Sequence, residues 1–287
     1  MISVKNLTFT YPGAPQETLH GLDFDIAEGE IFGFLGPSGA GKSTTQNILI
    51  ALLRGYGGHI QIMGRELSQW GHDLYEHIGV SFEMPNHYLK LTARENLDHF
   101  RSLYSGETHD PMAVLDWVGL ADDADKKVEE FSKGMKIRLN VARSIIHRPK
   151  ILFLDEPTTG LDPVNARNIK NLILEIRSRG TTVFVTTHDM MVADELSDRV
   201  AFITAGKIRL IDAPDALKKQ YGKREVRVEY LNGARKIEHQ EFPLDGLIDN
   251  KAFVSLMKTA NRVETIHSQE TTLENIFIKV TGQELTP

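Results

Sequence analysis

The amino-acid sequence predicts an α/β fold in which helices cover both faces of a parallel sheet. Apolar segments at residues 31–35 and 151–154 and a β-rich segment at 181–187 are separated by helical patterns. Strands buried on both faces of a parallel sheet read as continuous apolar runs, since neither face meets water. The 287 residues are 41% hydrophobic and 25% charged, which excludes collagenous, coiled-coil and disordered classes.

Residues 1–84 predict further strands. Leu22, Phe24 and Ile26 alternate with aspartates, which is the two-residue period of a half-buried strand. Apolar and polar residues also mix across residues 2–9, and Gly and Pro separate the segments. We therefore expect this region to be mainly β-structure.

Residues 85–148 carry a helical pattern instead. Leu97, Phe100 and Leu103 recur at intervals of three residues, and a second apolar group lies at 114–118. This spacing places side chains on one face of a helix. The sequence therefore predicts a helical insertion, after which strands and helices alternate again. The later helix is predicted by Ile169, Leu172, Ile173 and Ile176.

The pattern changes once more at residue 222. Val226, Val228 and Tyr230 alternate with polar residues, as in an exposed strand, and residues 273–280 show helical spacing. We expect one large domain at residues 1–221 and a small separate α+β unit at 222–287. The small unit is open to two interpretations, a packing or dimer-stabilising appendage and a regulatory or ligand-sensing domain.

Composition limits the possible functions. The absence of Cys excludes disulfides, a thiol nucleophile and cysteine-based metal sites. The first residues show no signal-peptide or transit-peptide pattern, and the apolar runs are shorter than the roughly 20 residues that a membrane-spanning helix needs. A net charge of -6 without a basic block argues against a nucleic-acid partner held by bulk electrostatics.

The strongest chemical signal lies at residues 36–44, which fit the pattern G-x-x-x-x-G-K-[ST] between an apolar strand and a predicted helix. Glycines let backbone N–H groups turn toward a phosphate, and the helix N-terminus adds partial positive charge. In this motif Lys42 reaches the β- and γ-phosphates of a nucleotide and Ser43 binds Mg²⁺. The predicted nucleotide loop consists of Gly36, Pro37, Ser38, Gly39, Ala40, Gly41, Lys42, Ser43 and Thr44.

A second signal is the apolar strand at residues 151–154, which ends in Asp155 and Glu156. Ligands of open α/β sheets bind at the carboxyl ends of strands, so both carboxylates are expected beside the nucleotide. Asp155 is then expected near Mg²⁺. Glu156 is expected near the terminal phosphate, where a carboxylate polarises an attacking water.

With these two motifs, residues 2–221 resemble the nucleotide-binding subunit of ATP-binding cassette (ABC) transporters. The resemblance implies a P-loop NTPase core with an N-terminal antiparallel β subdomain, beside the helical insertion and the C-terminal α+β unit. It implies that Asp155 contacts the metal and that Glu156 is the catalytic base. It also implies that His188 contacts the γ-phosphate as a second catalytic residue, that Tyr11 stacks on the adenine and that Asp162 belongs to the D-loop.

Two motifs depart from the family pattern. The signature loop, usually Leu-Ser-Gly-Gly-Gln, reads Phe-Ser-Lys-Gly-Met at residues 131–135, and it keeps Ser132 and Gly134 at the positions that meet phosphate. Glu83 stands where the family usually has Gln. A carboxylate there can bind the metal, but it adds negative charge beside a polyphosphate. These departures leave open the alternative of a slow regulatory cassette.

The resemblance implies an ATPase that binds ATP and Mg²⁺. Because the signature loop of one subunit faces the P-loop of another, it implies a homodimer with two ATP sites. The variant signature and the long C-terminal extension resemble the subgroup that serves ABC-2-type export permeases. We therefore expect an integral membrane permease as partner, attachment to the cytoplasmic face of the cell membrane, and no nucleic acid. A soluble ABC ATPase acting on ribosomes or DNA is the other alternative.

Overall fold

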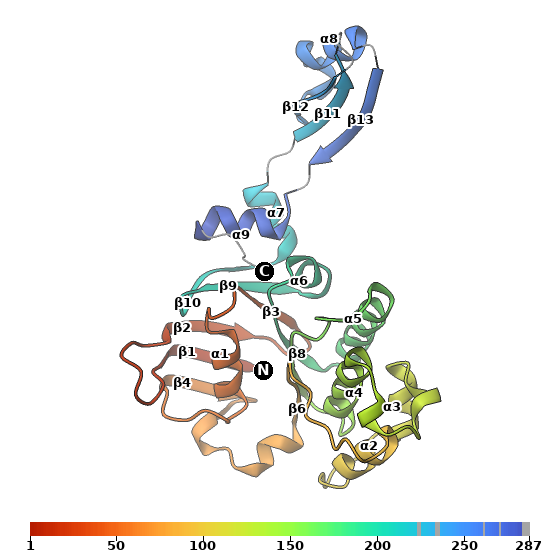
Figure 1. Ribbon diagram of the computed structural model, residues 1–287. Coiled ribbons are helices and arrows are strands. Elements are labelled where there is room, and N and C mark those ends of the chain that lie inside the picture. Colours follow the sequence, from red (N-terminus) through yellow and green to blue (C-terminus); the bar gives the residue numbers. More distant parts are fainter. Residues whose placement is uncertain (223–224, 233–235, 261, 270, 283–287) are drawn as a thin grey trace. The chain divides into compact units, whose positions relative to one another are not determined.

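The computed structural model describes residues 1–222, 225–232, 236–260, 262–269 and 271–282. The chain divides into two compact units, of which the first is formed by Met1–Ala213 and the second begins at Pro214 (Figure 1). The second unit starts eight residues before the expected boundary at residue 222. Each unit is described here by itself.

The first unit opens with a four-stranded antiparallel sheet, ordered β2-β1-β4-β5. In β2, Leu22, Phe24 and Ile26 are buried while Asp23 and Asp25 are exposed. The predicted alternation of buried and exposed residues in β2 is therefore confirmed, and so is the predicted antiparallel subdomain. The strands are β1 (Ile2–Phe9), β2 (Leu19–Ile26), β4 (Gly57–Ile62) and β5 (Arg65–Glu66).

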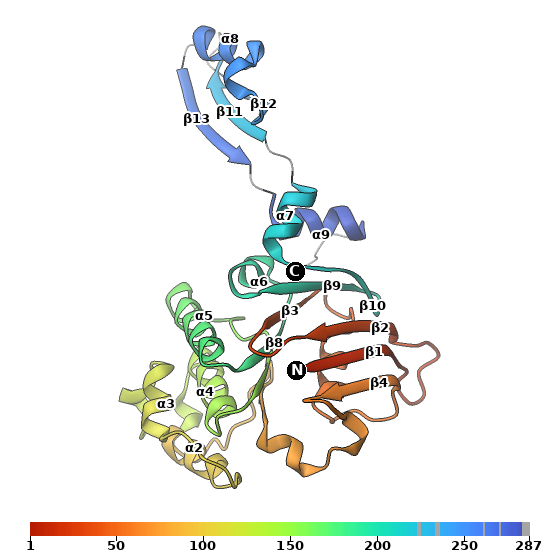
Figure 2. The same ribbon diagram turned by 180° about the vertical axis from the view of Figure 1, so that it is seen from behind.

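The second sheet has six strands in the order β10-β9-β3-β8-β7-β6, all parallel except the edge strand β10. Four of them, β3, β8, β9 and β10, are labelled in Figure 2. Every residue of β3, β7 and β8 is buried, which is why these strands have no polar alternation. The strands are β3 (Ile31–Leu35), β6 (Ile78–Ser81), β7 (Ile151–Asp155), β8 (Thr182–Thr187), β9 (Arg199–Thr204) and β10 (Lys207–Asp212).

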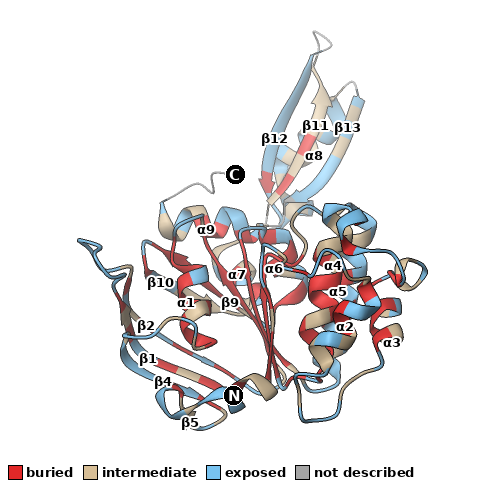
Figure 3. Cartoon of the chain, turned by 60° about the horizontal axis from the view of Figure 1, so that its bottom comes forward, coloured by how far each residue is buried: buried red, intermediate tan, exposed pale blue. Residues whose placement is uncertain are grey.

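Two cores form on the two faces of this parallel sheet, and the buried residues gather along its strands in Figure 3. On one face, Phe32 and Phe184 pack with helix α1 (Lys42–Leu49) and the antiparallel sheet. On the other, Leu152 and Val183 pack with α5 (Pro163–Ser178), α6 (Met190–Leu196) and the helical insertion. None of the described helices is long and apolar enough to cross a membrane.

The helical insertion consists of α2 (Ala93–Arg101), α3 (Pro111–Trp117) and α4 (Lys133–Ile145). Each helix starts where a capping side chain accepts a backbone N–H bond, namely Thr92, Asp110 and Ser132. Short 3₁₀ turns lie before the insertion at Leu67–Gln69 and His72–Glu76, and within it at Ala121–Asp123 and Val128–Glu130. The three helices of the insertion lie within the expected residues 85–148, and α4 leads from Ser132 back toward the parallel sheet.

The second unit has a three-stranded antiparallel sheet, ordered β12-β11-β13. Val226 and Val228 are buried, contrary to the exposed strand expected, because β11 is the central strand and α8 covers one face. Helices α7 and α9 contact each other, so α7 joins this unit. Its elements are α7 (Pro214–Tyr221), β11 (Glu225–Leu231), β12 (Ile237–Pro243), a 3₁₀ turn (Leu247–Asp249), α8 (Lys251–Thr259), β13 (Arg262–Gln269) and α9 (Leu273–Thr281).

Two buried histidines make the stability of the first unit depend on pH. Burial lowers the pKa of His87 and of His147 from 6.5 to about 4 each. Between pH 6.5 and pH 4 the unfolded chain binds protons that the native imidazoles do not. The free energy of unfolding therefore falls as the pH drops through this range. The expected loss is roughly 2 kcal/mol per histidine at pH 4.5. Urea denaturation at pH 7 and 4.5 measures it. His147→Asn should remove part of the difference, and an unchanged difference would contradict the assignment.

Candidate functional site

A cleft of about 360 Å³ lies at the carboxyl ends of the parallel strands β3, β7 and β8. Most of the residues predicted for the site line it together. Thr18 is an addition that the sequence analysis missed, because it stands before β2 in no recognisable motif. The lining consists of Tyr11, Thr18, Ser38, Gly39, Gly41, Lys42, Ser43, Thr44, Glu83, Asp155, Glu156 and His188.

The loop between β3 and α1 needs its glycines for different reasons. A Cβ on Gly36 would lie 2.1 Å from the carbonyl oxygen of Ile203, so the backbones approach too closely for any side chain. Gly41 has a φ of 108°, and a Cβ there would lie 2.7 Å from Leu19 Cδ2. The loop therefore holds a conformation in which backbone N–H groups can meet an anion at the start of α1.

Lys42 supplies the cation of the cleft. Its Nζ donates to the carbonyl oxygens of Gly36 at 2.7 Å and Pro37 at 3.0 Å. Burial lowers the pKa of Lys42, while the charges of Glu156, Asp155 and Glu83 act in the opposite direction. One ammonium thus lies among three carboxylates. Because the carboxylates repel a polyphosphate, the cleft suits one that brings a metal cation with it.

Asp155 ends strand β7 inside the cleft. It accepts a hydrogen bond from the Thr186 hydroxyl of the neighbouring strand. Burial raises the pKa of Asp155, and Glu156 and Glu83 raise it further, while the Thr186 hydrogen bond and Lys42 lower it. A bound cation next to this carboxylate would relieve the cost of burying it.

The Glu156 carboxylate accepts four hydrogen bonds. Oε1 accepts from the backbone N–H of His188 at 3.0 Å and lies 2.6 Å from its ring Nδ1. Oε2 accepts from the hydroxyls of Thr159 and Thr187, both at 3.0 Å. The backbone of Glu156 is left-handed, with a φ of 49°, which is uncommon outside glycine. Glu156 and His188 therefore form a pair whose geometry two threonines reinforce.

The donor set in the cleft fits Mg²⁺. Ser43, Glu83 and Asp155 all offer oxygen atoms, which hard divalent cations prefer. Across the described part of the chain, no group of three or more His, Asp or Glu side chains could hold a metal alone. Mg²⁺ typically uses one or two carboxylates and takes its other ligands from substrate phosphates and water. A site with only two carboxylates and a hydroxyl is therefore enough for Mg²⁺ that arrives with a nucleotide.

Tyr11 lies at the rim of the cleft. Its hydroxyl is 3.0 Å from Thr44 Oγ1, and its ring packs edge-on to Phe9 with the centroids 4.9 Å apart. The side chain is 39% exposed, so one part of the ring remains open to solvent. This position suits an aromatic that stacks on a planar ligand group.

Six predicted residues do not line this cleft. Gly36, Pro37 and Ala40 belong to the predicted nucleotide loop itself, whereas Ser132, Gly134 and Asp162 lie at the starts of helices α4 and α5. Ser132 caps α4 by accepting from the N–H of Met135 at 3.2 Å, and Asp162 caps α5 in the same way. Gly134 lies in the first turn of α4, where a Cβ would be 3.4 Å from Leu161 Cδ2. The signature and D-loop segments are therefore neighbours on one surface, and they do not line the nucleotide cleft of their own chain.

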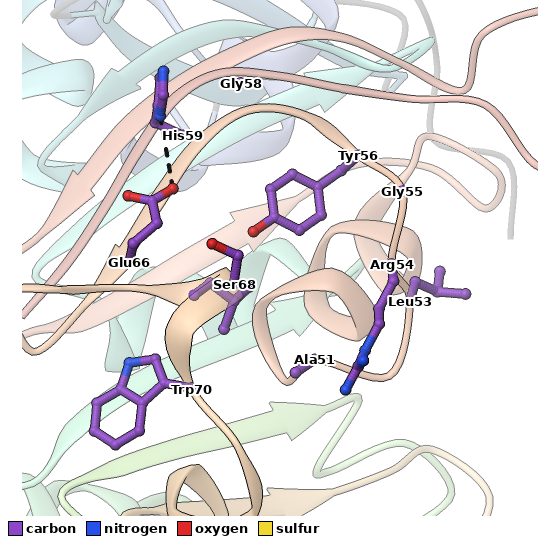
Figure 4. A pocket seen from close by; sticks show the side chains of 11 residues that line it. Ala51, Leu53, Arg54, Gly55, Tyr56, Gly58, His59, Glu66, Ser68 and Trp70 are labelled. Carbon is purple, nitrogen blue, oxygen red and sulfur yellow. Dashed lines mark ion pairs between the residues drawn. The ribbon is translucent and has the colours of Figure 1, made fainter.

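A larger cavity of about 550 Å³ lies near the end of α1 and strand β4 (Figure 4). Tyr56, Ser68 and Trp70 lie around it, and His59 forms an ion pair with Glu66 at 3.7 Å. Burial raises the pKa of Tyr56. No residue of the nucleotide loop lines this cavity, so its size does not make it the nucleotide site.

Comparisons with known proteins show which family this chain resembles. The ABC transporter family model matches residues 19–159, and the model described as the fluoroquinolone efflux ABC transporter C-terminal domain matches residues 224–270. The fluoroquinolones export ATP-binding protein of Mycobacterium tuberculosis (strain CDC 1551 / Oshkosh) is 55% identical over 100% of this chain and 95% of its own length. The bacitracin transport ATP-binding protein BcrA of Bacillus licheniformis is 34% identical, over 98% of this chain and 97% of its own.

Among solved structures, a dimeric ATP-binding cassette in a post-hydrolysis state with ADP and Pi is similar with a TM-score of 0.68. It is 28% identical to this chain and covers 74% of it and 98% of its own chain. About a quarter of this chain therefore has no counterpart in that structure.

Proposed function

The chain belongs to the ABC transporter family as the ATPase subunit of an exporter-type transporter, and we propose that it drives an ABC-2-type permease that exports fluoroquinolone-like compounds. The observation that carries the proposal is the 55% identity over the whole chain to a fluoroquinolones export ATP-binding protein. The match of residues 224–270 to an efflux-specific C-terminal model adds support. Both relatives are named as export or transport ATP-binding proteins, which favours the exporter over a soluble ABC ATPase.

We assign the bound nucleotide to the cleft at the ends of β3, β7 and β8. Lys42 and the backbone N–H groups of residues 38–44 would hold the β- and γ-phosphates of ATP, and Tyr11 would stack on the adenine. Ser43, Glu83 and Asp155 would hold Mg²⁺, which when bound supplies positive charge between the phosphates.

Glu156 and His188 would organise the attacking water. Glu156 orients the water and takes up its proton, while the His188 ring stays beside the carboxylate and reaches the γ-phosphate. The hydroxyls of Thr159 and Thr187 donate to Oε2 and so restrain the orientation of the carboxylate. The altered signature keeps the slow-cassette alternative open, and the turnover number decides between the two.

Two copies of the chain would complete the sites. Ser132, Gly134 and Asp162 lie on a surface outside their own cleft, so we propose that they meet the nucleotide held by a second copy. The ADP-bound relative is a dimer, which supports this arrangement. When the phosphate is released after hydrolysis, the contact that it shares with both copies is lost and the dimer can open.

We propose that the permease docks beside Glu83. Met84 is 83% exposed and Tyr88 is 51% exposed, so two large side chains close to Glu83 in sequence are open to a partner. Docking there would place the chain on the cytoplasmic face of the cell membrane. We also propose that the cassette function resides in residues 1–221 and that residues 222–287 form an extension of separate function.

The proposal is tested by transport in inverted membrane vesicles that contain this chain and its permease. ATP with Mg²⁺ should drive uptake of a fluorescent fluoroquinolone, and a non-hydrolysable ATP analogue should not. ATPase activity should rise when the permease is present. Permease-stimulated ATPase without fluoroquinolone uptake would contradict the substrate. No response of the ATPase to the permease would contradict the coupled exporter itself.

A further inference from the structure

One face of helix α4 is hydrogen-bonded to the loop that carries Glu83. Lys136, Asn140 and Arg143 stand at i, i+4 and i+7, and therefore share that face. The same helix begins at Ser132, which we propose to meet the nucleotide of the partner copy. Two functional segments are thus connected to a single rigid element.

Asn140 makes the central contact. Its side chain is 1% exposed, and Nδ2 donates to Ser81 Oγ at 3.0 Å and to the carbonyl oxygen of Phe82 at 2.7 Å. These residues immediately precede Glu83. Oδ1 accepts from Arg143 Nη2 at 2.7 Å. Breaking any of these bonds would leave a buried polar group without its partner, so the arrangement resists displacement.

A second anchor lies on the other side of Glu83. Arg143 Nη1 donates to the carbonyl oxygen of Asn86 at 2.6 Å. His87 Nε2 lies 2.9 Å from the carbonyl oxygen of Lys136. Burial lowers the pKa of His87 to about 4, so the ring is neutral at pH 7 and Nε2–H donates to that carbonyl.

We propose that Asn140 is a positioning residue that holds Glu83 at the nucleotide cleft. Residues 83–85 lie between two anchor points on the same helix, so the backbone is restrained on both sides of Glu83. The inference rests on the metal-binding role proposed for Glu83.

The test uses Asn140→Asp in the full chain. Asp has nearly the same shape, loses both donors to Ser81 and Phe82, and still accepts from Arg143. In the nucleotide-free protein, backbone amides of residues 82–87 should exchange hydrogen about tenfold faster. The Mg²⁺ concentration for half-maximal ATPase should rise about tenfold, as is usual when a group that supports a metal ligand is lost.

Asn96→Asp is the matched control. Asn96 is also 1% exposed and also binds loop backbone, since Oδ1 accepts from the N–H of Tyr88 at 3.0 Å. It lies on α2, and its side chain bonds to the backbone of Tyr88, Leu91 and Thr92 rather than to the residues beside Glu83, so the Mg²⁺ requirement should stay within about twofold of wild type. If Asn140→Asp does not fold, Ser81→Ala removes one acceptor and should shift both measurements less, in the same direction.

Glu83→Ala removes both carboxylate oxygens and separates the two proposals. If it leaves the Mg²⁺ requirement unchanged, the metal role of Glu83 fails, and hydrogen exchange alone decides the role of Asn140. If Glu83→Ala raises the requirement while Asn140→Asp leaves both measurements at the wild-type values, the positioning role is overturned. The double variant should need no more Mg²⁺ than the worse single variant, because both changes remove one function. Additive effects would also overturn the inference.

Discussion

Glu156→Gln is expected to lower the turnover number of ATP by roughly 10²–10⁴-fold, which is the range for loss of a general base. The amide has the shape of the carboxylate but cannot take a proton from water. ATP binding should persist, because Lys42 and the nucleotide loop are unchanged. The variant should therefore accumulate as an ATP-dependent dimer, measured by size-exclusion chromatography with and without Mg-ATP, beside steady-state phosphate release.

Glu107→Gln is a suitable control, because the Glu107 side chain is 86% exposed and forms an ion pair with Arg148, away from the cleft. It should hydrolyse ATP at the wild-type rate. Wild-type turnover by Glu156→Gln would show that another group acts as the base. A dimer that forms equally well without ATP would contradict the proposed role of the γ-phosphate in joining the two copies.

The nucleotide loop could be predicted because its chemistry is local. Within nine residues the chain supplies the glycines, the cation and the hydroxyl, and the flanking apolar strand fixes where the loop starts. Asp155 and Glu156 could be placed near it because all strand ends of a parallel sheet meet at one edge. Both predictions follow from short segments and a general rule of topology.

The threonines around Glu156 could not be predicted in the same way. Thr187 reaches Glu156 across 31 residues of sequence, and Asn140 reaches Phe82 across 58. These contacts depend on which strands and helices become neighbours, and a single hydroxyl or amide carries no signal of its own. The boundary at Pro214 was missed for the same reason, because α7 joins the second unit through α9, far along the chain.

Lys42→Ala is expected to weaken ATP binding by about 100-fold or more. A hydrogen bond to a charged group contributes roughly 1.5–3 kcal/mol, and 1.4 kcal/mol is a factor of ten in affinity. The loss should exceed that of one ion pair. Without the ammonium, Glu156, Asp155 and Glu83 remain in the cleft, and their charges oppose the polyphosphate without compensation. A fluorescent ATP analogue titrated at constant Mg²⁺ measures the dissociation constant.

Thermal unfolding gives an independent measurement of the same loss. Ligand stabilises the native chain by RT ln(1 + [L]/Kd), so ATP should raise the wild-type midpoint and barely move that of Lys42→Ala. Lys207→Ala, an exposed change on β10, should respond to ATP as the wild type does.

Lys42→Arg keeps the charge but places a planar fork where the ammonium meets the carbonyls of Gly36 and Pro37. Affinity restored fully by Arg would mean that charge alone matters. An intermediate value would show that the loop also selects the shape of the ammonium. Unweakened binding by Lys42→Ala would place the nucleotide outside this cleft.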